Sequence, residues 1–238
     1  MLGKFADFGY GLDKVVPIAF HVDYFNNPWR DPFSSPKWSA REAAYCQVLG
    51  RKELYYTPLL LVDGKYDALG NAGAQVEAAL KKALADPVLA SLDLSWGSTA
   101  PSRPTKSKSK SKTEEDPPKE ESPTRRILRA SVRALSPSED GKELLVGVVV
   151  TEDPLTTDVA SGENKGKKLV EHHVARSFTV ESVRPRTGRA VTVDVPVELG
   201  AGWKPGNCRV AVLLQDEQTG RVHQAASLAW GTKNDSRG

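Results

Sequence analysis

The stretch Val191-Thr192-Val193-Asp194-Val195 alternates apolar and polar residues, which is the pattern of a β-strand with one buried face. Further runs of strand-like composition occupy the rest of the C-terminal part, and clusters of Gly, Pro, Asn and Asp separate them. The predicted strands cover residues 128–135, 144–150, 170–180, 190–197, 209–215 and 222–228. Short strands at this spacing, with no helical periods between them, predict an all-β sandwich domain over residues 125–238.

The N-terminal part, residues 1–98, has a mixed α/β pattern. The continuous apolar run at residues 15–20 predicts a strand covered on both faces. Ser39 with Glu42 three residues later forms a capping-box pattern, which predicts a helix over residues 39–49. Further along, Asp63-Gly64 separates two short apolar runs and predicts a hairpin, and apolar residues at helical spacing predict a second helix over residues 72–84.

A polar segment at residues 99–124 separates these two parts. It has five prolines and no apolar residue larger than Ala100. Such a segment cannot bury enough apolar surface to offset the entropy of ordering it, so we expect a disordered linker between two separately folded domains. Its lysines are followed by acidic residues that partly neutralise them, which favours a solvated linker over a polybasic tail for nucleic acid.

Composition excludes several classes of protein. The 238 residues are 39% hydrophobic and 26% charged, which suits ordinary globular cores, and the net charge of +3 predicts no nucleic-acid partner. No run approaches the ~20 apolar residues of a transmembrane helix, and residues 1–13 lack the pattern of a signal peptide. The two cysteines, Cys46 and Cys208, belong to no Cys-x-x-Cys or zinc-ligand pattern, so we expect neither a metal nor another cofactor.

Several motifs resemble one protein family. His21-Val22-Asp23-Tyr24, then Trp29-Arg30-Asp31-Pro32-Phe33-Ser34-Ser35-Pro36, and Tyr56-Thr57-Pro58 together resemble the family of domain of unknown function 1223, a family of secreted type. Residues 162–167 and 210–215 resemble its C-terminal β-domain. The resemblance implies a thioredoxin-like first domain over residues 1–98, a cis peptide bond before Pro58, and a periplasmic or secreted location.

The sequence departs from this family at its start. Members typically begin with a strand that ends in Ser-x-Gly-Cys-x-x-Cys-Pro, whereas this sequence begins with Met1-Leu2-Gly3-Lys4-Phe5 and lacks the cysteine pair. The resemblance therefore implies an N-terminally incomplete thioredoxin-like domain. Either the true start lies upstream of Met1, or the protein is a degenerate or partner-completed form.

The candidate site is a binding edge made of His21, Asp23, Tyr24, Thr57 and Pro58. In the resembled fold, Pro58 would face the place of the dithiol, and His21 and Asp23 leave the predicted strand at residues 15–20. A histidine beside a carboxylate can handle protons near a thiolate, whereas the plainer interpretation is that His21 bonds to backbone and Asp23 caps a turn. A metal site combining these two with His172 or His173 has too few ligands, and adjacent histidines on a strand point to opposite faces.

We therefore predict a non-catalytic binding or accessory protein of the cell envelope, with a protein or peptide as partner. No residue of this chain is assigned a catalytic role. The alternative is a thiol–disulfide oxidoreductase whose Cys-x-x-Cys segment is missing from the recorded chain, because disulfide exchange needs an attacking and a resolving thiol. Translation of the DNA upstream of Met1 distinguishes the two hypotheses.

Overall fold

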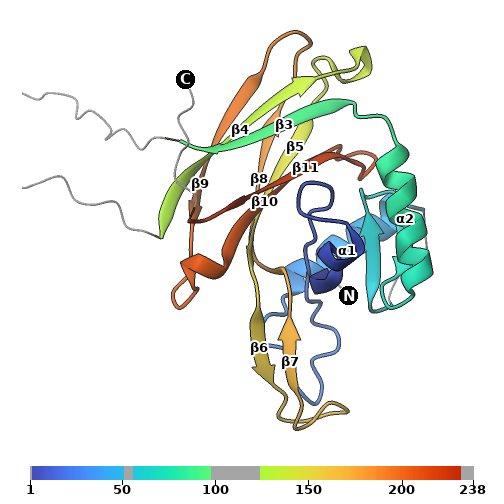
Figure 1. Ribbon diagram of the computed structural model, residues 1–238, viewed down its shortest axis with the longest axis vertical. Helices are drawn as coiled ribbons and strands as arrows, with labels where there is room; N and C mark the ends of the chain where they lie inside the picture. The colour runs from blue at the N-terminus through green and yellow to red at the C-terminus, as the bar shows by residue number, and fades with distance from the viewer. Residues whose placement is uncertain (1, 51–55, 98–123, 232–238) are drawn as a thin grey trace, which may run out of the picture.

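The computed structural model describes residues 2–50, 56–97 and 124–231, and its regular structure is mostly β. Two antiparallel sheets form its larger part (Figure 1). One sheet has the strand order β3 (Ala90–Trp96), β4 (Arg125–Ala134), β9 (Val191–Glu198), and the other has the order β11 (Val222–Ala229), β10 (Cys208–Gln215), β5 (Leu144–Glu152), β8 (Val174–Val183).

The inner faces of the two sheets pack together as a sandwich. Alternate residues of β5, Val146, Val148 and Val150, are buried against residues such as Leu128 on β4 and Val195 on β9. This period of two is what the sequence pattern predicts for strands that share one core. The predicted β-rich sandwich is therefore present, with short 3-10 turns at η3 (Pro137–Glu139) and η4 (Pro205–Asn207) between its strands.

The strand predicted over residues 170–180 is interrupted. The strand β7 (Lys168–Glu171) ends before His172, and His173 has a φ of +54°, which turns the chain before β8 begins. β7 instead pairs with β6 (Leu155–Asp158). Together they form a hairpin that projects from the end of the sandwich (Figure 1).

The expected boundary at residue 98 does not separate two folded units. β3 comes before the polar segment and β4 after it, yet the two pair directly, with Ala90 opposite Ala134 and Trp96 opposite Leu128. The strand-like segment before residue 98 therefore belongs to the same sheet as β4 and β9. The linker prediction itself falls almost entirely on residues 98–123, outside the described residues.

The predicted hairpin and second helix are both present in the N-terminal part. β1 (Leu59–Val62) pairs with β2 (Tyr66–Leu69), and α2 (Gly73–Ala85) follows. The helix buries Val76, Ala79 and Leu80 against Ala68 and against Phe5, which lies between the short turns η1 (Leu2–Lys4) and η2 (Ala6–Phe8).

A thioredoxin-type parallel sheet is not formed among residues 2–50 and 56–97. Residues 15–20 make a single parallel bridge, from Ala19 to Val174 on β8. The Ala19 N–H donates to the carbonyl of His173 at 2.8 Å, and the Ala175 N–H donates to the carbonyl of Ala19 at 2.9 Å. The apolar run therefore attaches to the edge of the sandwich, and Pro17 within it has no N–H to extend the pairing.

The first helix, α1 (Pro36–Val48), begins three residues before its predicted start. Ser35 is its N-cap, with the side chain accepting from the Lys37 N–H at 3.3 Å, and Pro36 occupies the first helical position that proline favours. Ser39 is therefore inside the helix rather than at its cap. None of the helices in the described ranges is long and apolar enough to cross a membrane.

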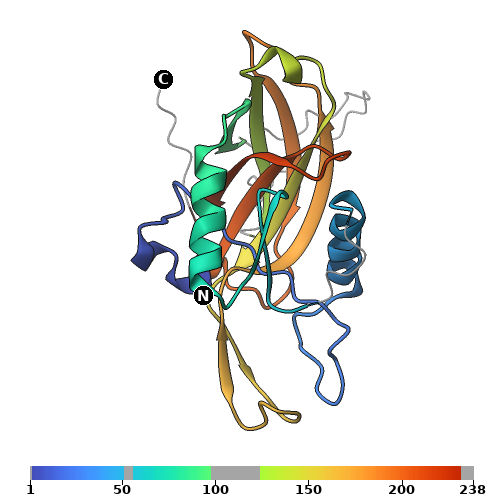
Figure 2. The ribbon, with the colours of Figure 1, turned by 90° about the vertical axis from the view of Figure 1, so that its right-hand side faces the viewer.

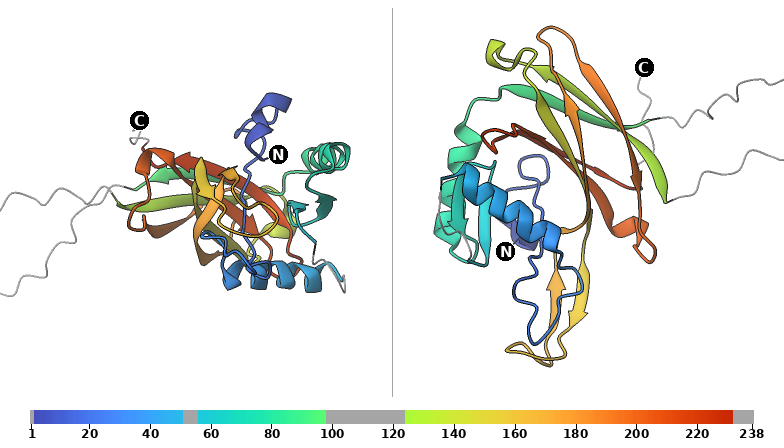
Figure 3. Two further views of the ribbon diagram at one scale, coloured as in Figure 1. Left: turned by 90° about the horizontal axis from the view of Figure 1, so that it is seen from below. Right: turned by 180° about the vertical axis from the view of Figure 1, so that it is seen from behind.

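α1 lies across the outer face of the four-stranded sheet (Figures 2 and 3). Trp38 and Cys46 are its buried residues, and Trp38 packs on Val149, Ala175 and Ala211 of the sheet. Val16, Ile18 and Phe20 complete this outer layer. The N-terminal part thus covers a face of the C-terminal sandwich.

Candidate functional site

A groove with a volume of about 780 Å³ lies between α1 and the outer face of the sheet. We call it the α1 groove. The helix contributes Lys37, Arg41 and Tyr45 to its lining, and β8 contributes Arg176 and Phe178. Residues of the loop before α1, Trp203, and the turn after β10 complete the lining.

Arg41 is held at the centre of an aromatic cluster. Its Cζ lies 4.6 Å from the ring centroid of Phe178, 5.2 Å from that of Tyr45 and 5.3 Å from that of Phe20. Its Nη2 donates to Tyr45 Oη at 3.2 Å and to Gln215 Oε1 at 3.3 Å. Gln215 is fixed in turn, because its Nε2 donates to Tyr45 Oη at 2.7 Å and to the carbonyl of Gly220 at 2.9 Å.

The charge of Arg41 has no acidic partner among the residues that the structure describes. Burial lowers the pKa of the guanidinium, and the interaction with Tyr45 offsets this only in part. Arginine nevertheless stays protonated in proteins. A fixed positive charge therefore lines the α1 groove without a carboxylate to neutralise it.

Arg176, the second arginine of the groove, is neutralised. Its Nη1 donates to Glu152 Oε2 at 3.0 Å, and the side chain of Glu152 is only 3% exposed. The guanidinium lies between the rings of Phe33 and Trp203, at 5.1 and 5.0 Å from their centroids. Arg176 therefore has a structural role in the wall of the groove.

The residues of the predicted binding edge have other partners. Nδ1 of His21 donates to Oδ2 of Asp31 at 2.6 Å, so Asp31 and not Asp23 is the carboxylate beside this histidine. Asp23 binds Ser39, whose Oγ donates to Asp23 Oδ1 at 2.5 Å and accepts from the Asp23 N–H at 3.1 Å.

Tyr24 and Pro58 also form hydrogen bonds with residues outside the predicted binding edge. Tyr24 Oη donates to Oε2 of Glu42 at 2.9 Å, so Asp23 and Tyr24 both fasten the loop to α1. The Thr57-Pro58 peptide bond is cis, as the family resemblance implies. The Pro58 carbonyl accepts from the Gly70 N–H at 2.7 Å, which ties the pair to hairpin β1–β2. These hydrogen bonds do not bring the five predicted residues together as one site.

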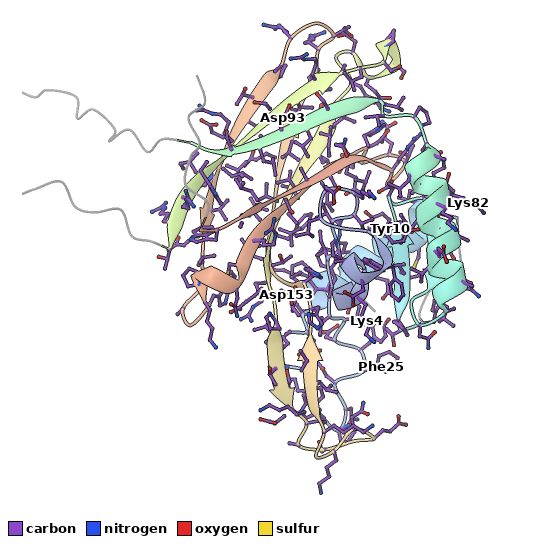
Figure 4. All side chains as sticks on the ribbon, in the orientation of Figure 1. Lys4, Tyr10, Phe25, Lys82, Asp93 and Asp153 are labelled. Carbon is purple, nitrogen blue, oxygen red and sulfur yellow. The ribbon has the colours of Figure 1, made fainter. Side chains whose placement is uncertain are left out.

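His172 and His173 face the same carboxylate, in contrast to the prediction that they point apart. Nδ1 of His172 lies 2.7 Å from one Asp153 oxygen, and Nδ1 of His173 lies 3.2 Å from the other. Asp153 lies at the root of the β6–β7 hairpin (Figure 4). The positive φ of His173 breaks the strand alternation on which the prediction rested.

The two cysteines are buried and form no disulfide. Burial raises the pKa of the Cys208 thiol to about 11, and the negative charge of Glu152 adds to this effect. Because the thiolate is the form that attacks a disulfide, Cys208 is a poor nucleophile at neutral pH.

Comparison with known families agrees with the sequence resemblance over part of the chain. The family described as "Protein of unknown function (DUF1223)" matches residues 5–119. Residues 5–119 are therefore similar to that family. The match confirms the resemblance seen around His21 and Pro58, whereas the resemblance of residues 162–167 and 210–215 to a family β-domain lies beyond it and stays a prediction.

Two solved structures share the fold. Protein AGR_C_4864 from Agrobacterium tumefaciens aligns with a TM-score of 0.64 at 19% identity, over 99% of this chain and 88% of its own. HBP35 of Porphyromonas gingivalis aligns with a TM-score of 0.58 at 13% identity, over 85% of this chain and 61% of its own. No curated protein matches the chain. At these identities the likeness concerns the fold alone.

Proposed function

We propose that this protein is a binding protein whose α1 groove takes an organic carboxylate with an aromatic or similarly flat apolar body. The observation that carries the proposal is the half-buried Arg41, which has no acidic partner among the described residues. Removing a charge from water is costly unless another group compensates it. A bound carboxylate supplies that compensation.

The hydrogen-bonding capacity of Arg41 supports this ligand class. A guanidinium has five N–H donors in a planar fork that matches a carboxylate, and the two hydrogen bonds of Arg41 both come from Nη2. Donors on its other nitrogens therefore remain available for a ligand. The stacked rings of Phe178 and Tyr45 hold the fork in one place, so little freedom is lost on binding.

The lining of the groove suits the apolar part of such a ligand. Its volume of about 780 Å³ is within the range of small-molecule sites, roughly 300–1,000 Å³. Phe33, Trp38, Tyr45, Phe178 and Trp203 contribute aromatic surface. The charges of the exposed Lys37 and Glu217 cancel in the sum, and Arg176 is paired with Glu152. Arg41 is therefore the uncompensated charge of the lining.

A small aromatic acid and a peptide that ends in an aromatic residue both present a carboxylate beside an aromatic ring. The peptide agrees with the expected protein or peptide partner, and the family resemblance suggests that the protein binds either ligand in the cell envelope. The test therefore uses both: 2-naphthoate as the small acid and N-acetyl-Ala-Ala-Phe as the peptide, each beside its neutral amide.

Isothermal titration calorimetry of the full chain measures the affinity for each acid and amide. At least one acid should bind more tightly than its amide. Arg41→Met should weaken the binding of that acid by about 10–100-fold, because hydrogen bonds to charged groups contribute about 1.5–3 kcal/mol. The same substitution should leave the binding of the amide nearly unchanged.

Arg129→Met is the matched control. Arg129 is an exposed arginine on β4 that pairs with Asp194, and it does not line the groove. This variant should bind the acid as the native chain does. Equal affinity for acid and amide, an Arg41→Met variant that binds the acid normally, or no binding of any probe would each overturn the proposal. Circular dichroism checks that both variants are folded.

A further inference from the structure

Three side chains meet at the root of the β6–β7 hairpin, outside the set that lines the α1 groove. They are His21, Asp31 and Glu171, and one ligand atom from each lies within 4.8 Å of the others. We call them the His21 cluster. His21 follows the apolar run at residues 15–20, Asp31 belongs to the loop before α1, and Glu171 is the last residue of β7. Three separate segments therefore bring their polar groups to one point.

The cluster holds two carboxylates with one histidine and no lysine or arginine. Among the described residues, Glu171 forms no salt bridge, and Asp31 forms one only with His21. The side chains of His21 and Asp31 are mostly shielded from water, at 18% and 19% exposed. The balance of charge at this point therefore favours an added cation.

Neighbouring groups orient the carboxylates. Thr157 Oγ1 donates to Glu171 Oε2 at 2.9 Å, and Thr157 is itself only 8% exposed on β6. The Phe33 N–H donates to Asp31 Oδ1 at 2.8 Å, which leaves Oδ2 of Asp31 directed at His21. Such outer hydrogen bonds fix the ligands of protein metal sites and tune their affinity.

We propose that the His21 cluster binds a divalent transition-metal ion, with Zn²⁺ as the best match. Imidazole nitrogen and carboxylate oxygen are both ordinary zinc ligands. Three protein ligands leave a fourth position for water or another ligand, as in zinc sites that are not closed. The hydrogen bond between His21 and Asp31 then forms only without metal. A bound ion lies between the two side chains and replaces this hydrogen bond.

The sequence predicted no metal site here. The only combination considered there joined His21 and Asp23 to His172 or His173, and Asp23 binds Ser39 instead. Asp31 and Glu171, which do lie beside His21, are ten and 150 positions away from it in the sequence, so no local motif could predict the cluster.

A second histidine–carboxylate pair at the same hairpin root provides a matched control. Nδ1 of His172 lies 2.7 Å from Asp153, much like the His21–Asp31 pair. The positive charge of Arg209, however, acts on the adjacent His173 and opposes a cation there. Asp153→Asn therefore alters a similar pair without touching the proposed site.

The experiment titrates the untagged full chain with Zn²⁺ by calorimetry, and with Co²⁺ by visible absorption, in the absence of any organic acid. The native chain should bind one ion per chain. Glu171→Gln and His21→Ala should each weaken binding more than about 100-fold, and Thr157→Val should weaken it by about 10–100-fold, as outer-shell changes do. Asp153→Asn and Arg41→Met should leave the metal affinity unchanged.

The absence of saturable binding to the native chain would overturn the proposal. So would loss of binding in Asp153→Asn together with normal binding in Glu171→Gln. Should His21→Ala fail to fold, Glu171→Gln and Thr157→Val, which nearly keep the shape of the side chain, still decide the outcome. Because Arg41→Met tests the α1 groove and Glu171→Gln the His21 cluster, either proposal can fail without the other.

Discussion

Gly64 shows at the scale of one residue how closely the two parts of the chain approach each other. Its φ is +65°, and a Cβ added there would lie 1.9 Å from the carbonyl oxygen of Gly220. The neighbouring Asp63 carbonyl accepts from the Val222 N–H at 2.8 Å. The tip of hairpin β1–β2 therefore docks backbone to backbone on the turn between β10 and β11, where a side chain has no room.

We expect Gly64→Ala to lower the free energy of unfolding by about 1–3 kcal/mol, because it adds both a strained φ and a clash with backbone. Urea denaturation measures the change. Gly73→Ala is the control, since Gly73 opens α2 with nothing within 4 Å of an added Cβ. That variant should be as stable as the native chain or more stable, and equal losses in both variants would contradict the interpretation.

Asp216 makes stability depend on pH. Burial acts to raise its pKa, but hydrogen bonds from Lys142 and from the N–H groups of Thr219 and Gln218 outweigh burial and hold the pKa below the usual 3.8. Lys142 Nζ lies 2.5 Å from Oδ2 of Asp216, whose side chain is 4% exposed. Because the folded-state pKa is the lower one, this carboxylate stabilises the fold above about pH 4 and loses that effect as the pH falls through its folded value.

Asp216→Asn should therefore lower the free energy of unfolding at pH 7 by about 1.5–3 kcal/mol, the range for hydrogen bonds to charged groups. The difference from the native chain should shrink below about pH 4, where the native carboxyl group also becomes protonated. Denaturation curves from pH 3 to 7 measure it. Asp93→Asn, at an exposed position of β3 (Figure 4), is the control and should change little at pH 7. A loss independent of pH would contradict the assignment.

The partners of single side chains were the least predictable part of the site. Sequence motifs drew attention to His21, but its carboxylate partner could not be chosen without knowing how residues 21–35 fold back on themselves. The residue type of Arg41 did not mark it as a site residue, since a lone arginine in a predicted helix is ordinarily exposed. Its importance comes from Phe178 and Gln215, which are more than 130 residues away along the chain.

At the scale of elements, β5 explains why α1 belongs to the sandwich. Val146, Val148 and Val150 point into the core, while Val149 on the opposite face packs against Trp38 of α1. A strand that is apolar on both faces needs a cover on both faces. The sequence of β5 therefore indicates an outer layer, although it does not say which segment forms that layer.

Trp38→Ala should remove much of the contact between α1 and the sheet. Trp38 is 6% exposed, and its ring centroid lies 5.0 Å from that of Phe20. We expect a loss of about 3–5 kcal/mol in the free energy of unfolding, which is typical for a buried tryptophan cut to alanine. Hydrogen exchange of the α1 amides should speed up more than exchange in β4.

Val48→Ala is the control at the element scale, because Val48 lies at the end of the same helix and is 39% exposed. It should leave both the unfolding free energy and the exchange of α1 close to native values. Equal exchange in Trp38→Ala and Val48→Ala would contradict the packing of α1 on the sheet.

Helices and strands were predicted well where the spacing of apolar residues or a turn motif determined them. The helix α2 and most sandwich strands follow directly from helical spacing or alternation, and hairpin β1–β2 follows from the Asp63-Gly64 turn. The errors fall where one backbone angle or one tertiary contact decides the outcome. His173 breaks a predicted strand through its positive φ, and residues 15–20 attach to β8 rather than to a parallel sheet of their own.

At the scale of the whole molecule, the two parts of the sequence form one structure. β3 and β4 pair across the segment at residues 98–123, and α1 covers the sheet that contains β5 and β8. Composition identified the polar segment but could not show this, because composition does not reveal whether the flanking residues belong to one sheet. The α1 groove depends on this union, since Arg41 comes from one part and Phe178 from the other.

The most direct test of this account cuts the chain between its two parts. A site for a specific protease is inserted after Lys112, and the protein is cleaved there and examined by gel filtration and by titration with whichever acid the uncut protein binds. We predict that the fragments elute together and bind the acid with the affinity of the uncut protein, separating only in denaturant. Fragments that elute apart without denaturant would contradict the account, as would a cleaved complex that no longer distinguishes the acid from its amide.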